Sequence, residues 1–340
     1  MERTDGSTHK VTFIEARMEA VAEEMRRDPK VITWGEDMRS GLMGFGGASL
    51  IDEFGAHRVF DPPISENAMV GVAVGVAALG YRPIVNLCVA NFATYAFDQI
   101  VNQASRVRYL FGGQAASPLT VHIGMNTALA GGAHHTDRTY PMLMNVPGLK
   151  IVTPTTPRNA RGLWKAAIRD DAPVIVYDRA MLSARKEEVP DDPDFVIPIG
   201  QAEIVREGTD VTLVSVVCRD ETTRAAKKLA EVGISAEVID PLSLVPLDID
   251  TILASVEKTG RLVIADVAND TNSAASHIAA LVADRGYRYL RAPIRRVCTP
   301  DVHIPHSRPL ESVVFPTPAR IVREVQTLVE ASDALELVVR

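Results

Sequence analysis

The sequence has few cysteines and no excess of basic residues. Its 340 residues include only three cysteines, Cys88, Cys218 and Cys298, which lie far apart and form no CxxC pair. This spacing indicates neither a disulfide framework nor a zinc site, so we expect a reduced, cytoplasmic protein. The formal net charge is -7. Since no basic stripe is present, nucleic acid is not an expected partner.

Long hydrophobic runs are also missing. The longest apolar run, 68–80, is shorter than the roughly 20 residues that a membrane-spanning helix needs. The first ten residues lack the apolar core of a secretory signal and contain acidic residues, so we expect neither a secretory signal nor a typical organellar transit peptide, and no membrane partner. We predict instead that the run is a buried helix capped by Ser65. Gly71 and Gly75 share one face of it, where another backbone could approach closely.

Several motifs with known chemistry are absent. The sequence contains no GxxxxGK[ST], HExxH or GxSxG. The glycine-rich stretch 41–47 resembles part of a dinucleotide-binding fingerprint, but Ser49 replaces its third glycine, and we interpret the stretch as a loop. His303 and His306 have a spacing that could suggest a metal, yet the intervening Pro305 disfavours a helical ligand pair.

Short apolar segments alternate with segments of helical periodicity along the whole chain. This alternation predicts α/β architecture with mostly parallel sheets. A capping box, Thr12 with Glu15, begins a predicted helix over 14–27, and a second helix is predicted over 95–108.

The length suggests two domains. The segment 186–198 is acidic and holds three prolines, so it is predicted to be neither helix nor central strand. We interpret it as a linker between domains covering 1–185 and 199–340.

Five polar or aromatic residues in or beside the predicted loops are candidates for chemistry: Glu66, Phe92, His134, His135 and Asp137. A carboxylate, an aromatic platform and a histidine suit an organic cofactor with a ring to stack and a nitrogen to protonate. Each residue also has a structural explanation, as an ion pair, a core ring, a backbone-bonded histidine or a turn cap. The residues alone predict an α/β enzyme subunit with a cofactor cleft.

The segment Val59–Glu66, VFDPPISE, closely resembles the "RVxDTPISE" segment of the β subunits of 2-oxo acid dehydrogenase first components. These proteins belong to the transketolase-like, thiamine-diphosphate-dependent superfamily. Further similar segments, in the same order along the chain, are 35–37, 97–104, 147–152, 167–170, 237–240, 258–261, 291–293 and 310–311.

The resemblance implies two three-layer α/β/α domains, one binding the pyrimidine and one of the transketolase C-terminal type. It implies an oxidoreductase that decarboxylates a 2-oxo acid, or cleaves acetoin, and passes the acyl group to the disulfide of a lipoyl arm. Glu66 matches the carboxylate that binds N1′ of the aminopyrimidine and helps to activate the C2–H of the cofactor. Phe92 matches the aromatic residue that packs on the pyrimidine, and His135 matches a catalytic histidine.

The family's diphosphate and Mg²⁺ motif, Gly-Asp-Gly followed by Asn, is absent, and in relatives it lies on the α subunit. The resemblance therefore implies an α2β2 heterotetramer, with Mg²⁺ held mainly by the partner and a lipoyl acyltransferase core docked on the C-terminal domain. Four positions match a structural potassium site in some relatives: Leu119, Ala167, Ile168 and Asp170.

Departures from the family pattern leave the substrate and the acceptor open. The family's "AQHSQ" reads here Ala133–Asp137, AHHTD, which places His134 and Asp137 beside the catalytic position. An adjacent Asp137 is expected to raise the proton affinity of His135. Some segments resemble acetoin dehydrogenase β subunits, and others resemble the branched-chain enzyme.

Two alternatives follow. One is a split transketolase-like ketol or acyl transferase that has no lipoyl partner. The other, from a different class, is a non-catalytic nucleotide-binding electron-carrier subunit, whose expected fingerprint is broken at Ser49.

Overall fold

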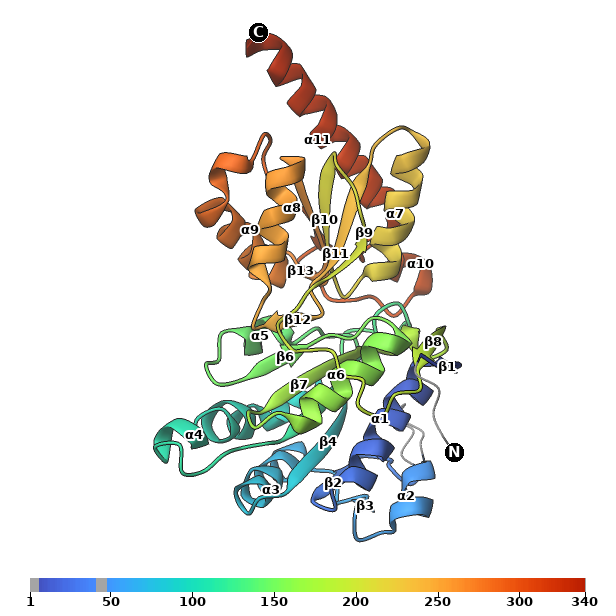
Figure 1. Ribbon diagram of the computed structural model, residues 1–340, viewed down its shortest axis with the longest axis vertical. Helices are drawn as coiled ribbons and strands as arrows, with labels where there is room; N and C mark the ends of the chain where they lie inside the picture. Colours follow the sequence, from blue (N-terminus) through green and yellow to red (C-terminus); the bar gives the residue numbers. More distant parts are fainter. Residues whose placement is uncertain (1–5, 41–47, 340) are drawn as a thin grey trace. The chain divides into compact units, whose positions relative to one another are not determined.

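The computed structural model describes residues 6–40 and 48–339, with side chains up to 331. The glycine-rich stretch 41–47 lies outside the described residues. Contacts divide the chain into two compact units, one made of Met1–Leu129 and His134–Ile199, the other of Ala130–Ala133 and Gly200–Arg340. Figure 1 labels the helices and strands of both units and colours them along the chain.

A parallel sheet forms the centre of the first unit. Its strands have the order β6 (Lys150–Val152), β7 (Val174–Arg179), β5 (Thr120–Met125), β4 (Arg82–Val89), β2 (Val31–Gly35) and β3 (Val59–Phe60), and each neighbouring pair is parallel. Their side chains are mostly buried, as expected for strands covered on both faces. The carboxyl ends of all these strands therefore meet at one edge, where ligands bind in open α/β sheets.

Helices cover both faces of this sheet. They are α1 (Phe13–Arg27), α2 (Ala48–Phe54), α3 (Glu66–Ala78), α4 (Val107–Leu110), α5 (Tyr140–Met144) and α6 (Pro157–Arg169), with 3₁₀ turns η1 (Phe92–Ala96) and η3 (Ala180–Leu182) and the π-helical η2 (Gln99–Ala104). On one face α1 packs on α6, and on the other α3 packs on η1, η2 and β4. The predicted layered α/β architecture is confirmed.

The predicted start of α1 is confirmed in detail. The Thr12 hydroxyl accepts from the Glu15 backbone N–H at 3.2 Å, and the Glu15 carboxylate accepts from the Thr12 N–H at 2.7 Å. This reciprocal capping box satisfies two backbone donors that the helix itself leaves free.

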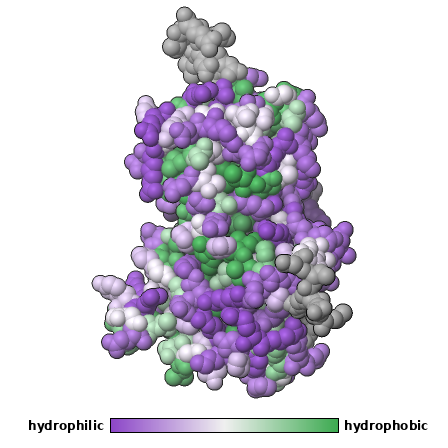
Figure 2. All heavy atoms as spheres, in the orientation of Figure 1, coloured by the Kyte–Doolittle hydropathy of each residue, from purple (hydrophilic) through white to green (hydrophobic). Residues whose placement is uncertain are grey.

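Helix α3 occupies the expected place, but it is not buried as predicted. Only Met69, Val70, Ala73 and Ala77 are buried, while Val72 is 57% exposed. The helix is apolar on all sides, and β4 with its neighbours covers one side only. Green, hydrophobic atoms reach the surface at the lower left of Figure 2, where α3 and α4 lie in Figure 1.

Ser65 is the N-cap residue of α3, although its side chain makes no capping bond. A Cβ on Gly71 would lie 3.1 Å from Oε1 of Gln99, so a side chain rather than a backbone approaches there. A Cβ on Gly75 would meet nothing within 4 Å.

The single helix predicted over 95–108 is wrong. The segment is divided into η1, η2 and α4. The Ser105 hydroxyl donates to the Val101 carbonyl at 2.7 Å, and the Ser105 N–H reaches back five residues to Ile100. Such side-chain bonding competes with regular helical bonding, and π-turns of this kind occur often beside functional sites.

The segment expected to be a linker begins as a strand. Here β8 (Lys186–Pro190) pairs antiparallel with β1 (Thr8–Thr12), and both belong to the first unit. Pro190 ends the pairing, so the prolines bound the strand rather than prevent it. The main part of the second unit begins at Gly200.

The second unit has a five-stranded sheet in the order β14 (Arg295–Thr299), β13 (Leu262–Asn269), β10 (Val211–Val216), β11 (Ala236–Asp240) and β9 (Glu203–Arg206). Only β9 is antiparallel to its neighbour in this sheet. The further elements are β12 (Ser243–Val245), α7 (Arg219–Glu231), α8 (Ile249–Thr259), α9 (Ala274–Arg285), η4 (Tyr287–Tyr289), α10 (Arg308–Glu311) and α11 (Pro318–Val339). Helix α8 packs on α9, and α7 packs on α11. Within the described ranges, no helix combines the length and apolarity needed to cross a membrane.

Candidate active site

Glu66 lies at the carboxyl edge of the first unit's sheet. The short strand β3 and the segment 61–65 lead to it, and it is the first residue of α3, half-buried. A helix N-terminus stabilises a carboxylate, because unpaired backbone N–H groups and the helix dipole favour negative charge there.

A second carboxylate, Glu36, faces Glu66 from the end of β2. Glu36 is 9% exposed, and its Oε1 has no hydrogen-bond partner among the described residues. Burial, followed by the charge of Glu66, raises the pKa of Glu36. One proton shared between the two carboxyls would satisfy the buried oxygen and relieve the repulsion. The segment 35–37 is one of the points of family resemblance, but the sequence alone gives Glu36 no chemical role.

The backbone is strained at two residues beside Glu36. Asp37, next to Glu36, has φ +57°, and Cys88, at the end of β4, has φ +55°. Non-glycine residues adopt this left-handed conformation rarely, and such residues cluster at functional sites. Close approaches explain two glycines here. A Cβ on Gly35 would lie 2.5 Å from Asn86, and a Cβ on Gly124 would lie 2.2 Å from the Cys88 carbonyl oxygen.

Phe92 and His135 lie together at the same edge of the sheet. Phe92 begins η1 directly after β4, and His135 is in the loop that follows β5. Their ring centroids are 5.6 Å apart, with the rings at 75°, an edge-to-face arrangement. Because η1 also packs on α3, the half-buried Phe92 ring lies on the element next to Glu66.

Asp137 has its hydrogen bonds with Asn91, not with His135, in the part of the chain that the structure describes. Its carboxylate accepts from Asn91 Nδ2 at 2.6 Å, and its N–H donates to Asn91 Oδ1 at 3.1 Å. The pair ties the histidine loop to the residue before Phe92. His134 is exposed on the same loop.

The four positions of the potassium hypothesis lie at the other end of the sheet. Leu119 precedes β5, while Ala167, Ile168 and Asp170 end α6. Two carbonyls of this set, those of Ile168 and Asp170, accept from Arg82 Nη1 at 3.1 and 2.9 Å. A guanidinium thus lies where the hypothesis places a cation. Over the described residues, no cluster of three or more His, Cys, Asp or Glu side chains could hold a metal.

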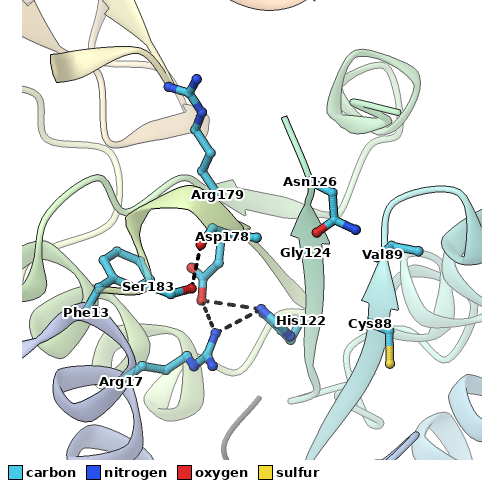
Figure 3. A pocket seen from close by; sticks show the side chains of 11 residues that line it. Phe13, Arg17, Cys88, Val89, His122, Gly124, Asn126, Asp178, Arg179 and Ser183 are labelled. Atoms are coloured by element: carbon cyan, nitrogen blue, oxygen red, sulfur yellow. Dashed lines mark hydrogen bonds and ion pairs between the residues drawn. The ribbon is translucent and has the colours of Figure 1, made fainter. Parts of the chain in front are cut away.

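A cavity of about 240 Å³ lies at the ends of β4, β5 and β7, and Cys88, the neighbour of Glu36 across the sheet edge, is one of its lining residues. Figure 3 shows three of its buried side chains converging from separate elements, Arg17 from α1, His122 from β5 and Asp178 from β7. Arg17 Nη1 donates to Asp178 Oδ2 at 2.8 Å and lies 3.3 Å from His122 Nε2. The sequence signal for this cluster is a charged or polar residue within each of three apolar segments, which sequence reasoning did not use.

The sequence matches known protein families along most of its length. Residues 9–183 match the family described as "Transketolase, pyrimidine binding domain", and residues 200–321 match "Transketolase, C-terminal domain". The β subunit of acetoin:2,6-dichlorophenolindophenol oxidoreductase from Bacillus subtilis is 42% identical over 92% of this chain and 95% of that protein. The chain belongs to the transketolase-like family of dehydrogenase β subunits.

Other members of the family are similar over nearly the same range. The pyruvate dehydrogenase E1 component subunit beta of Rhizobium meliloti is 39% identical over 94% of this chain and 70% of that protein. The 2-oxoisovalerate dehydrogenase subunit beta of Bacillus subtilis is 35% identical over 94% of this chain and 99% of that protein. A solved structure entitled "Split gene transketolase, inactive beta4 tetramer" aligns with a TM-score of 0.77 over 94% of this chain and 99% of that one, and at 24% identity it supports the fold alone.

The residues at this edge fit the thiamine diphosphate that the family uses. Oε1 of Glu36 is buried without a hydrogen-bond partner among the described residues, and Glu66 provides the outer, half-buried member of the carboxyl pair. Phe92 provides a ring that an aminopyrimidine could contact. When bound, the cofactor supplies a C2 carbon that attacks carbonyl groups. Glu66 would bind its aminopyrimidine nitrogen, and Glu36 would share the proton.

Proposed function

We propose that the chain is the β subunit of a thiamine-diphosphate-dependent dehydrogenase component that acts on acetoin or a 2-oxo acid. The observation that carries this proposal is the Glu36–Glu66 carboxyl pair beside Phe92, in a chain whose relatives with these activities match along most of its length. The substrate stays open between acetoin, pyruvate and branched 2-oxo acids. Its three cysteines are buried and form no disulfide with one another, which suits a reducing compartment such as the cytoplasm.

In this proposal Glu66 binds and orients the aminopyrimidine and takes part in proton transfer at its ring nitrogen. Glu36 holds the shared proton, and Phe92 packs on the ring. His135, edge-on to Phe92, lies where it could exchange a proton with the substrate or the acceptor. A partner α subunit would hold the diphosphate and Mg²⁺, because the sequence of this chain has no motif for them. We further propose an α2β2 assembly and transfer of the acyl group to a lipoyl acyltransferase.

The test is exchange of the C2 proton of thiamine diphosphate for deuterium, followed by NMR on the chain co-expressed with its α partner. Glu66→Ala is expected to abolish catalysed exchange while the assembly remains intact on gel filtration. Glu231→Ala, at the exposed end of α7, is the matched control and should exchange at the wild-type rate. Normal exchange in Glu66→Ala would refute the role given to Glu66.

A separate experiment tests which group accepts the acyl product, because the segment His135-Thr136-Asp137 departs from the family pattern. Reductive acylation of a lipoyl domain would be measured with acetoin, pyruvate and branched 2-oxo acids. Acylation with one of them would support the dehydrogenase. Absence of acylation together with carbon–carbon transfer to an aldehyde would support the split transketolase-like transferase instead.

The potassium site is proposed separately. If the carbonyls near Ile168 and Asp170 hold K⁺ alongside Arg82, the melting temperature should rise in KCl relative to tetramethylammonium chloride at equal ionic strength. Equal melting temperatures would indicate that Arg82 alone satisfies those carbonyls.

A further inference from the structure

The end of β4 contains an irregularity that positions the functional segment. The pairing of β4 with β5 shifts register between Asn86 and Val89, and Cys88, inside the shift, has φ +55°. Such a bulge re-aims the chain that follows it. Here the re-aimed chain leads directly to Phe92. A left-handed cysteine persists only where surrounding contacts hold it, because the conformation itself is unfavourable.

Asn86 provides those contacts. Its side chain is fully buried, and its Oδ1 accepts from the Cys88 N–H at 3.1 Å. Its Nδ2 donates to the Glu36 carbonyl oxygen at 3.4 Å and lies 3.7 Å from Cys88 Sγ. One amide therefore fixes the bulge and also ties it to the backbone of Glu36. These contacts require the amide to keep one orientation, with its oxygen toward the bulge.

His122 sets that orientation. Its Nδ1 lies 2.7 Å from Asn86 Oδ1, and since an amide oxygen only accepts, Nδ1 must carry the proton. The other nitrogen, Nε2, lies 3.3 Å from both Arg17 Nη1 and Asp178 Oδ2. With the proton on Nδ1, Nε2 accepts from Arg17, whose charge Asp178 balances. Burial lowers the pKa of His122, which agrees with a neutral ring. Figure 3 shows the ring of His122 facing Arg17 and Asp178.

We propose that His122 is a positioning residue for the active site: its Nδ1–H orients Asn86, which holds the Cys88 bulge and the Glu36 backbone so that the Glu36 carboxyl faces Glu66. His122 does not itself touch the reacting groups. The inference rests on the proposed function only for its catalytic readout, since the contacts of Cys88 can be tested without any cofactor.

Two substitutions separate the two ring nitrogens. His122→Asn places an amide N–H near the position of Nδ1, whereas His122→Gln places it near Nε2 and leaves Asn86 Oδ1 without this donor. In the complex with its α partner, His122→Gln is expected to lose about tenfold in kcat, the equivalent of one buried hydrogen bond, with the KM for thiamine diphosphate unchanged. His122→Asn should stay within about twofold of wild type. A purely space-filling role predicts similar losses for both.

The second readout is alkylation of Cys88 by iodoacetamide in the full chain without cofactor, quantified by mass spectrometry. Cys218, buried in the second unit, is the internal control. Loosening of the bulge in His122→Gln should raise the rate at Cys88 about tenfold relative to Cys218, and His122→Asn should restore it. Asn86→Ala removes the intermediate contact and should match His122→Gln in both readouts, so it serves as the test if His122→Gln does not fold.

The outcomes are distinguishable. Wild-type alkylation of Cys88 in both His122→Gln and Asn86→Ala would overturn the inference. Equal loss of kcat in His122→Asn and His122→Gln would overturn it as well. If neither the wild type nor any variant exchanges the C2 proton of thiamine diphosphate, the proposed function fails. The alkylation rates of Cys88 still decide whether His122 holds the bulge.

Discussion

The carboxyl groups of Glu36 and Glu66 face one another across the carboxyl edge of the first unit's sheet, one at the end of β2 and the other at the start of α3. Neither element could supply the pair alone. The parallel sheet brings them together, because strands that run in one direction end at one edge. Burial and the charge of Glu66 together raise the pKa of Glu36.

The first prediction concerns how the ionisation of Glu36 changes the free energy of unfolding with pH. Its pKa in the folded chain lies above the ordinary carboxyl value of 4.5, with burial as the leading cause and Glu66 as the second. A raised carboxyl pKa means that the folded state binds the proton more tightly than the unfolded state. The contribution of Glu36 to stability is therefore complete below the ordinary value and declines as the pH rises through the raised pKa.

Glutamine at this position cannot titrate. The difference in unfolding free energy between wild type and Glu36→Gln should thus shift in favour of the variant from about pH 4 to pH 8, a range that spans the ordinary carboxyl pKa. Urea denaturation at a series of pH values measures it, with Glu231→Gln as the exposed control. A difference that stays constant with pH would show that Glu36 does not titrate as its surroundings indicate.

The second prediction assigns the partner of Asp137. The mutual hydrogen bonds of Asp137 and Asn91 are 2.6 and 3.1 Å long and partly exposed. A double-mutant cycle with Asp137→Ala and Asn91→Ala should give a coupling energy of about 1 kcal/mol in urea unfolding. The matched cycle of Asp137→Ala with His135→Ala should give a coupling near zero. A larger coupling with His135 would favour the sequence-based view that Asp137 acts on the histidine.

Local sequence was sufficient where one element decides the structure. The Thr12–Glu15 capping box is an interaction within four residues, and it forms as predicted. Glu66, Phe92 and His135 lie at the edge of the sheet where the predicted strand ends place them, and their chemical roles stay predictions. The approach of Glu36 to Glu66 was not predicted, because the two residues are thirty positions apart and only the folded sheet brings them together.

Other features depend on contacts that no local pattern contains. The left-handed Cys88 lies in a segment with the composition of a regular strand, and only Asn86, His122 and Glu36 together hold it there. The helix predicted over 95–108 is interrupted by a π-turn, in which the Ser105 N–H donates to the Ile100 carbonyl and its hydroxyl to the Val101 carbonyl. The exposure of α3 could not be predicted either, since an all-apolar sequence does not say which molecule covers each face.

The third prediction concerns that exposed face of α3. Since nothing lies within 4 Å of a Cβ at Gly75, Gly75→Leu should leave the isolated chain folded and stabilise it by up to about 1 kcal/mol through helix propensity. If a partner subunit packs closely on this face, the added side chain should reduce assembly with the α chain on gel filtration. Ala283→Leu, exposed on α9, is the control and should assemble normally. Unimpaired assembly of Gly75→Leu would place the interface elsewhere.

The fourth prediction concerns β1, which His9 attaches to the rest of the first unit. His9 Nδ1 lies 2.5 Å from Asp191 Oδ1, just beyond β8, and its Nε2 lies 3.0 Å from Glu19 Oε2 on α1. Burial opposes the charge on the ring, but Glu19 and Asp191 outweigh it and raise the pKa of His9 above 6.5. The stabilisation is then complete below pH 6.5, the ordinary histidine value, and is lost as the pH rises through the raised pKa.

Accordingly, His9→Gln should destabilise the chain more at pH 6 than at pH 9, with pH 9 above the usual histidine range. Urea unfolding at both pH values measures this, with the exposed His57→Gln as the control, and an equal loss at both would show that the ring acts without its charge.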